Sequence, residues 1–145
     1  MHSACTLKGI VDVFCEVSEE GIYINSIEMI PESTLLANAT TLWQLINVAQ
    51  NILKPRSIPA VAPLNDTEIA ILGGSSNSDV IVFNTTTKTC QKVSAGGDYK
   101  FDADGNQCVQ AGINKVVALV QDEDTKPAVI SWTKGASAVT ILSKF

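Results

Sequence analysis

A two-strand pattern recurs along the sequence, and this repetition restricts the fold more than any other feature. The segment EIAILGGSSNSDVIVFN, which starts at Glu68, aligns without a gap with KVVALVQDEDTKPAVIS, which starts at Lys115. In both segments two apolar runs flank a polar stretch, a pattern typical of two β-strands joined by a loop. Repeats of one small unit predict a modular fold in which each unit buries its surface against its neighbours.

A third copy of the pattern lies upstream, in GIVDVFCEVSEEGIYINSIEMI. In this copy Val11 to Glu16 match Ile69 to Gly74. After a loop that is four residues longer, Asn25 to Ile30 match Asp79 to Asn84. The hairpin unit is therefore expected three times in the chain.

Each copy also has one short apolar segment before the hairpin and another after it. The preceding segments are HSACTLKG, PRSIPAVAPLND and GNQCVQAGIN, and the following segments are LWQLINV, TCQKV and AVTIL. Each unit is therefore predicted to hold four short strands, with a spacing of about 47 to 58 residues between units. Such units are typical of β-propeller blades.

One segment also fits a helix. Between residues 41 and 53 the apolar residues recur at helical spacing, Thr40 or Thr41 is a suitable N-cap, and Pro55 is a suitable stop. The repeat instead predicts a strand at 42–47 followed by a loop. We favour the strand, because it agrees with the pattern of the other two units.

The units resemble the kelch repeat. In that family the second strand of a blade ends in Gly-Gly, the third strand ends in an aromatic-Asp pair, and the fourth strand carries a Trp. The second unit matches best, with Arg56 before its first strand, then Gly73-Gly74, then Phe83-Asn84, and Cys90 at the spacing of the family's Trp.

The other two units depart from the kelch pattern. Unit one has His2 to Gly9 as its first strand and Trp43 in its fourth, but Cys15-Glu16 stands in place of Gly-Gly. Unit three has Val120-Gln121 there, and Ile130 replaces the aromatic residue. Trp132 lies two residues further on, so its register is open.

The resemblance implies an all-β fold, a partial β-propeller of about three four-stranded antiparallel blades. The chain 1–145 is then one propeller fragment, with blade one at about 2–48, blade two at about 55–94 and blade three at about 106–143. Three blades leave two outer faces open, whereas a closed propeller has about four to eight. We expect the chain to be part of a longer propeller, or to complete a ring with copies of itself.

Four residues are expected to have structural roles. Gly73 and Gly74 end a strand where the backbone packs tightly and turns, and a positive φ there would exclude a Cβ. A phosphate-binding loop would require a helix next, but a second strand is predicted. Phe83 is expected in the scaffold, and Trp43 between blades.

By resemblance, the expected function is non-catalytic protein–protein interaction through loops on one face. The candidate contact residues are Glu19, Glu20, Arg56, Ser75, Ser76, Asn77, Ser78, Tyr99, Asp122, Glu123, Asp124 and Lys126. Nucleic acid is excluded as a partner, because the net charge is −5 and the 10 Lys and Arg residues form no cluster.

No catalytic residue, metal or cofactor is expected. The only histidine is His2, no G-x-S-x-G occurs, and the four cysteines form no metal-ligand spacing. The sequence DADGN at 102–106 lacks the flanking oxygen donors of a calcium loop. Two alternatives stay open: a fragment of a kelch-like oxidase or sugar isomerase with its active site in other blades, and a structural β-sandwich with strands paired between units.

The expected location is the cytoplasm. No stretch approaches the roughly 18 apolar residues of a membrane span, and the start of the chain has no signal-peptide pattern. Each cysteine sits beside apolar residues, which favours buried thiols in a reducing compartment over disulfides.

Overall fold

The fold consists of three four-stranded antiparallel sheets, which we call modules one, two and three. A computed structural model describes residues 3–14, 26–37, 43–48, 52, 59–74, 79–95, 107–121 and 127–145. Module one holds β1 (Ser3–Leu7), β2 (Ile10–Phe14), β3 (Ile27–Pro31) and β4 (Gln44–Ile46). Module two holds β5 (Ala60–Pro63), β6 (Glu68–Leu72), β7 (Val80–Asn84) and β8 (Thr89–Val93). Module three holds β9 (Gln107–Gly112), β10 (Lys115–Gln121), β11 (Pro127–Thr133) and β12 (Thr140–Lys144).

Every described strand pairs within its own module. The order in each sheet follows the chain, from β1 to β4, from β5 to β8 and from β9 to β12. The residues Ile69–Leu72 pair with Val80–Phe83, as the repeat predicts. The all-β character and the three antiparallel units are therefore confirmed, and the alternative with pairing between units is not observed among these strands.

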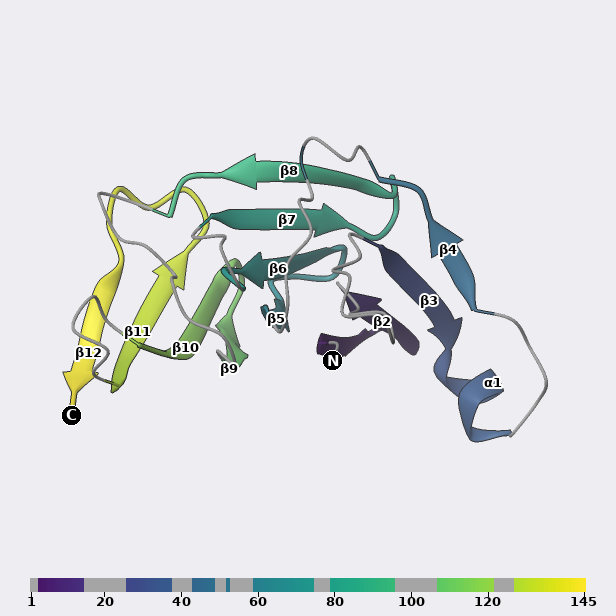
Figure 1. Ribbon diagram of the computed structural model, residues 1–145, viewed down its shortest axis with the longest axis horizontal. Helices are drawn as coiled ribbons and strands as arrows, with labels where there is room; N and C mark the ends of the chain where they lie inside the picture. The colour runs from purple at the N-terminus through teal and green to yellow at the C-terminus, as the bar shows by residue number, and fades with distance from the viewer. Residues whose placement is uncertain are drawn as a thin grey trace, which may run out of the picture.

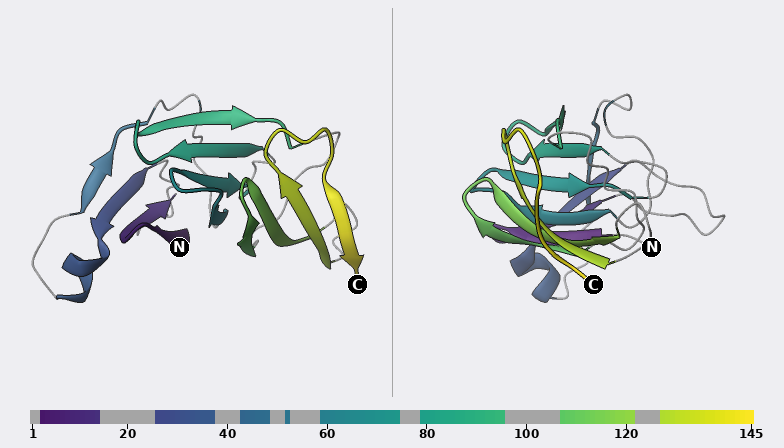
Figure 2. Two further views of the ribbon diagram at one scale, coloured as in Figure 1. Left: turned by 180° about the vertical axis from the view of Figure 1, so that it is seen from behind. Right: turned by 90° about the vertical axis from the view of Figure 1, so that its left-hand side faces the viewer.

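The three modules form an arc with one open side (Figure 1). The first strands lie on the inside, where β5 contacts both β1 and β9. The fourth strands β4, β8 and β12 lie on the outside, and the views in Figure 2 show the sheets of modules one and three at the two ends of the arc.

Strand register corrects the repeat alignment in module three. In module two Ile69 pairs with Phe83, and at the matching point of module three Val116 pairs with Trp132. The gap-free alignment had placed Ile130 there and was wrong by two residues in this strand. Trp132 is therefore the aromatic residue of the third strand, and it is fully buried.

Module one needs a smaller correction. Here Val11 pairs with Ile30, so Ile30 is the residue equivalent to Phe83. The alignment of Ile30 with Asn84 was wrong by one residue, because the length of the connecting loop is not fixed by the apolar pattern.

A backbone hydrogen bond at one end of each hairpin confirms this corrected equivalence. In each module the residue that directly follows the third strand donates its N–H to the carbonyl of the residue that directly precedes the second strand. The three bonds are Glu32 N–H to Gly9 O at 2.8 Å, Thr85 N–H to Thr67 O at 2.8 Å, and Lys134 N–H to Asn114 O at 2.9 Å.

Two hydrophobic clusters hold the modules face to face. The first junction, between modules one and two, contains Phe14, Ile27, Met29, Ile46, Ile69, Ile71, Ile81, Phe83 and Cys90. The second junction, between modules two and three, contains Ala60, Ala62, Leu64, Ala70, Leu72, Val80, Val82, Val116, Ala118, Val120, Ala128, Ile130 and Trp132. The sheet of module two is thus buried on both faces.

Module three is buried on one face only. Val116, Ala118 and Val120 are buried in the second junction, but Leu119, on the other face of β10, is 47% exposed. The reason is positional, since no described sheet packs against that face.

The glycine pair has the backbone conformation that the sequence predicts. Gly73 has φ +60° and Gly74 has φ +99°, values that residues with a Cβ rarely adopt. The Gly73 N–H donates to the carbonyl of Asp79 at 3.0 Å, and strand β7 follows rather than a helix. Phe83 is fully buried, as a scaffold residue should be.

The region after β3 differs in part from expectation. Strand β4 confirms the strand within 41–53, but a short helix, α1 (Glu32–Leu36), precedes it and was not predicted. This helix has no buried residue and no side-chain N-cap, so it left no apolar pattern to recognise. Trp43 was expected between modules, but it lies just before the outermost strand and is 39% exposed. In the described part of the chain, no helix has the length and apolar character that a membrane crossing requires.

Candidate functional site

The predicted contact residues lie outside the described part of the chain. This holds for all twelve: Glu19, Glu20, Arg56, Ser75, Ser76, Asn77, Ser78, Tyr99, Asp122, Glu123, Asp124 and Lys126. The described residues that flank the loops between second and third strands are Phe14 and Ile27, Gly74 and Asp79, and Gln121 and Pro127. Because the three sheets have the same strand order and direction, these flanking residues share one edge of the arc, which we call the loop edge.

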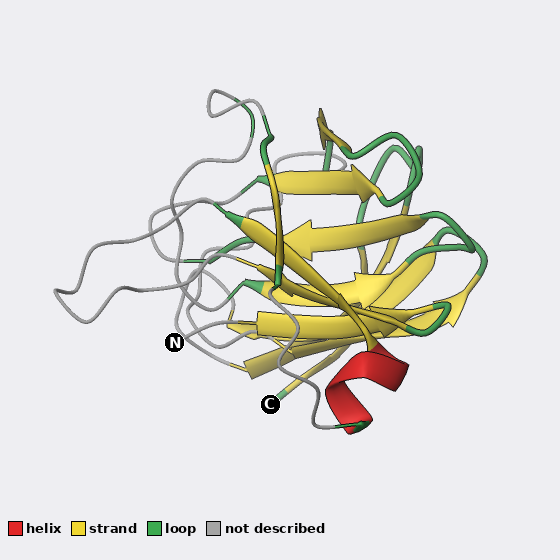
Figure 3. Ribbon diagram, turned by 90° about the vertical axis from the view of Figure 1, so that its right-hand side faces the viewer, coloured by secondary structure: helices red, strands yellow, loops and turns green. Residues whose placement is uncertain are grey.

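The opposite edge carries the short turns and α1, and we call it the turn edge. Figure 3 shows the turns of the three modules gathered on one side. The β1–β2 turn places Lys8 and Gly9 at positive φ, and the β9–β10 turn does the same with Asn114. Short turns with these conformations match the right-handed twist of paired strands.

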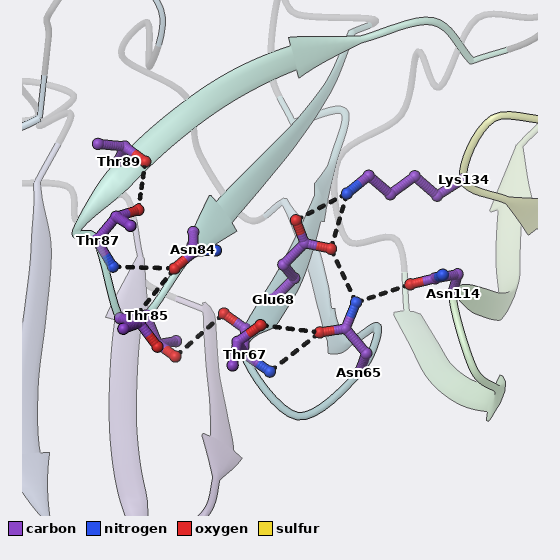
Figure 4. A network of polar contacts seen from close by, with 10 residues as sticks. Asn65, Thr67, Glu68, Asn84, Thr85, Thr87, Thr89, Asn114 and Lys134 are labelled. Carbon is purple, nitrogen blue, oxygen red and sulfur yellow. Dashed lines mark hydrogen bonds and ion pairs between the residues drawn. The ribbon is translucent and has the colours of Figure 1, made fainter.

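A polar network joins modules two and three at the turn edge (Figure 4). The Asn65 side chain lies at its centre. Its Nδ2 donates to Oδ1 of Asn114 at 2.7 Å and to Oε2 of Glu68 at 2.8 Å. Its Oδ1 accepts the backbone N–H of Thr67 at 3.0 Å, so the same amide also fixes the β5–β6 turn.

An ion pair extends this network across the second junction. The Lys134 Nζ lies 2.7 Å from both carboxylate oxygens of Glu68. The two side chains are only 28% and 18% exposed. The hydrogen bond from Lys134, aided by that from Asn65, lowers the pKa of Glu68 despite its partial burial. Glu68 is therefore held as a carboxylate.

Backbone contacts at the turn edge complete the connection. The Asn114 N–H donates to the carbonyl of Leu64 at 2.7 Å, and Gln110 Nε2 donates to the same oxygen at 3.1 Å. Within module two, the Asn84 Oδ1 accepts the N–H groups of Thr86 and Thr87 and so closes the β7–β8 turn. These residues were missed from the sequence, although Asn and Thr next to strand ends are a usual sign of turn hydrogen bonds.

An open groove of about 400 Å³ lies beside this network, on the outer side of the second junction. Its lining comes from β8 and the β11–β12 turn: Gln91, Lys92, Val93, Ser94, Lys134, Gly135 and Ala136. Two lysines contribute to the groove, but the ammonium of Lys134 is engaged by Glu68.

The first junction encloses an ionisable group. Asp12 is fully buried, and neither carboxylate oxygen has a hydrogen-bond partner among the described residues. The positive charge of Lys88 acts on Asp12, and the Lys88 Nζ contacts the sulfur of Met29, the strand partner of Asp12, at 3.1 Å. Desolvation raises the pKa of Asp12 to about 6, and the charge of Lys88 opposes part of the rise.

The described cysteines of the inner strands are poor nucleophiles. Burial raises the pKa of both Cys5 and Cys108 to about 12, with a smaller contribution from Asp12 at Cys5. Both thiols are free. A thiolate is the reactive form of cysteine, so these two side chains act as small apolar groups here.

Among the described residues, no three His, Cys, Asp or Glu side chains come close enough to hold a metal ion. The geometry that the structure does describe is that of packed sheets linked by polar contacts. Comparison of the sequence with family models and with curated proteins finds no match.

Proposed function

We propose that the chain is a kelch-type β-propeller scaffold that binds a protein partner through its loop edge. The observation that carries this proposal is the stacking of three equivalent four-stranded antiparallel sheets, face to face, with their first strands side by side on the inside of the arc. Propeller blades have this strand order and this packing.

The distribution of polar contacts supports the choice of edge. At the turn edge, the side chains of Asn65, Glu68 and Lys134 bond to one another and fix module two against module three. These groups are engaged within the chain. The loop edge joins longer segments with the acidic residues and serines that the sequence analysis singled out, and loops on a rigid scaffold are common binding elements.

The test compares substitutions at the two edges. A first variant carries Glu19→Lys, Glu20→Lys, Asp122→Lys and Asp124→Lys. A control carries Asp66→Lys and Thr86→Lys at the turn edge, where both residues are exposed. Proteins retained by the immobilised wild-type chain are identified, purified and titrated against each variant by interferometry.

We expect the loop-edge variant to bind a retained protein at least tenfold more weakly than the wild type does, a loss of about 1.4 kcal/mol or more in binding free energy. We expect the control to bind it within about twofold of the wild type. Loss of binding only in the turn-edge control would overturn the assignment of the edge. Absence of any protein that binds in purified form would overturn the proposed function.

A further inference from the structure

The outward face of module three repeats a face that is buried in module two. We call the side of a sheet toward the next module its trailing face, and the opposite side its leading face. By register, Leu119 on the trailing face of module three is equivalent to Leu72 in module two. Leu72 is fully buried against module three, whereas Leu119 is 47% exposed. Val109, which pairs with Val117 on the same face, is also exposed.

The leading face of module one is the other sheet face that no described module covers. It is open only in part, because Ile30, the equivalent of Phe83 on this face, is buried in the single chain. Trp43 and Leu45 are both exposed near it, and Leu45 lies beside Glu28 in the sheet. In modules two and three the leading face is buried in a junction, by Phe83 and Trp132 respectively. The two open surfaces are thus opposite halves of the type of junction that forms twice within the chain.

Charged residues at the turn edge also fit such a contact. Across the second junction, Glu68 of module two pairs with Lys134 of module three. The residue equivalent to Glu68 in module three is Lys115, because each directly follows the residue whose carbonyl accepts the repeated backbone bond. The residue equivalent to Lys134 in module one is Glu32, because each donates that bond. A third junction would therefore bring Lys115 against Glu32, the same ion pair with its charges exchanged.

The first junction shows that this complementarity is not a general feature of the repeat. Its equivalent positions are Ile10 and Thr85, which carry no charge. Opposite charges thus occur at the second junction and at the two open surfaces, but not at the first junction. Equal charges on the two open surfaces would have opposed their contact. Both Lys115 and Glu32 are exposed in the single chain.

We propose that a second copy of this chain closes the arc, with the trailing face of module three of each copy packed on the leading face of module one of the other. This inference rests on the propeller-type stacking proposed above. Closed propellers have about four to eight blades, and six is the only multiple of three in that range, so the ring holds two copies. A head-to-tail contact forms such a ring when its rotation closes.

The first experiment measures the mass of the purified chain by sedimentation equilibrium. A closed ring predicts a species of twice the 15.4 kDa chain mass, with no larger species as the concentration rises. A monomer at all concentrations would overturn the proposal and would indicate that other modules or another partner cover these faces. A series of larger species would overturn ring closure.

Charge reversal then tests the orientation of the contact. Lys115→Glu and Glu32→Lys each place equal charges together at both junctions between copies, and we expect each to weaken the dimer by roughly tenfold or more. The double variant restores the opposite pairing, so we expect dimerisation within about threefold of the wild type. Single variants that leave the dimer unchanged, or a double variant without rescue, would contradict the proposal.

A hydrophobic variant gives an independent readout. Leu119→Lys is expected to abolish the dimer, whereas Ile113→Lys, at an exposed apolar residue in the β9–β10 turn, leaves it intact. Circular dichroism of both variants reports whether the sheets are retained. Binding of the loop-edge partner to the Lys115→Glu variant separates the two proposals. If the variant binds the partner as the wild type does and its dimer is unchanged, only the ring is refuted.

Discussion

The two junctions use the same backbone arrangement but differ in where their charged groups lie: the second has a hydrogen-bonded ion pair at its rim, and the first encloses a carboxylate. At the second junction the polar groups of Asn65, Glu68 and Lys134 meet one another at the rim, and the interior is filled by aliphatic side chains and Trp132. At the first junction the rings of Phe14 and Phe83 meet edge to face at 6.0 Å, and Asp12 is enclosed with no hydrogen-bond partner among the described residues.

This difference indicates that the repeat specifies stacking, while individual side chains set the strength of each junction. An unpartnered buried carboxylate is costly, whereas a partly buried ion pair with several hydrogen bonds is favourable or neutral. The stability of the first junction should therefore depend on pH in the acid range. The stability of the second junction should depend most on the packing of Trp132. The following predictions test this contrast.

The largest effect is expected at Trp132. Its side chain is fully buried, so Trp132→Ala should lower the free energy of unfolding by about 3–5 kcal/mol through lost burial and a cavity. Urea unfolding followed by circular dichroism measures the change. Trp43→Ala, at an exposed tryptophan, should cost less than about 1 kcal/mol.

Trp132→Phe sharpens the same test. Phenylalanine is the residue at the equivalent position of module two, and it removes the indole N–H, which has no hydrogen-bond partner in the described part of the chain. We expect a loss of about 1 kcal/mol, because reduced burial is offset by removal of an unsatisfied donor. A loss as large as that of the alanine variant would mean that the indole nitrogen has a role that the described contacts do not explain.

Substitution of Asp12 should give the next largest effect, and at neutral pH it should stabilise the protein rather than destabilise it. Asp12→Asn removes a buried charge, so its free energy of unfolding at pH 7 should exceed that of the wild type by about 1–3 kcal/mol. The pKa of Asp12 rises from 3.8 to about 6 on folding, so the folded protein takes up this proton first. The wild type should therefore gain stability relative to the variant as the pH falls from about 6 to about 4.

Urea unfolding of both proteins at pH 4, 5, 6 and 7 measures this difference. Asp12→Ala, with the residue found at the equivalent position Ala70, should remove the same pH dependence while leaving a small cavity. A difference between wild type and Asp12→Asn that stays constant over this range would show that the carboxylate is solvated or paired in solution.

The strand content and the modular pairing could be predicted from the sequence, because alternation of apolar runs and turns is a local signal. Register in the third strands could not, since Trp132 and Ile130 are both apolar and only the length of the preceding loop decides which one faces Val116. The network around Asn65 joins residues 49 positions apart, and the exposure of Trp43 depends on its place at the outer end of a sheet. Such facts follow from packing between modules, which the local pattern does not contain.

The smallest effect is expected from the ion pair of the second junction, compared with an exposed pair at the first. A double-mutant cycle with Glu68→Gln and Lys134→Met should give a coupling energy of about 1 kcal/mol at pH 7, because both side chains are mostly buried and hydrogen-bonded. Because folding lowers the pKa of Glu68, the stabilisation is fully present at pH values above the pKa of an unfolded glutamate. It should be lost as the pH falls through the lower pKa of the folded state.

The Lys8–Asp66 pair, at 3.2 Å but 60% and 87% exposed, should have a coupling energy of less than about 0.5 kcal/mol, and this energy should fall further in 1 M salt. Equal coupling for the two pairs would mean that burial at the second junction does not strengthen its polar contacts, and the contrast between the junctions would then reduce to Asp12 and Trp132.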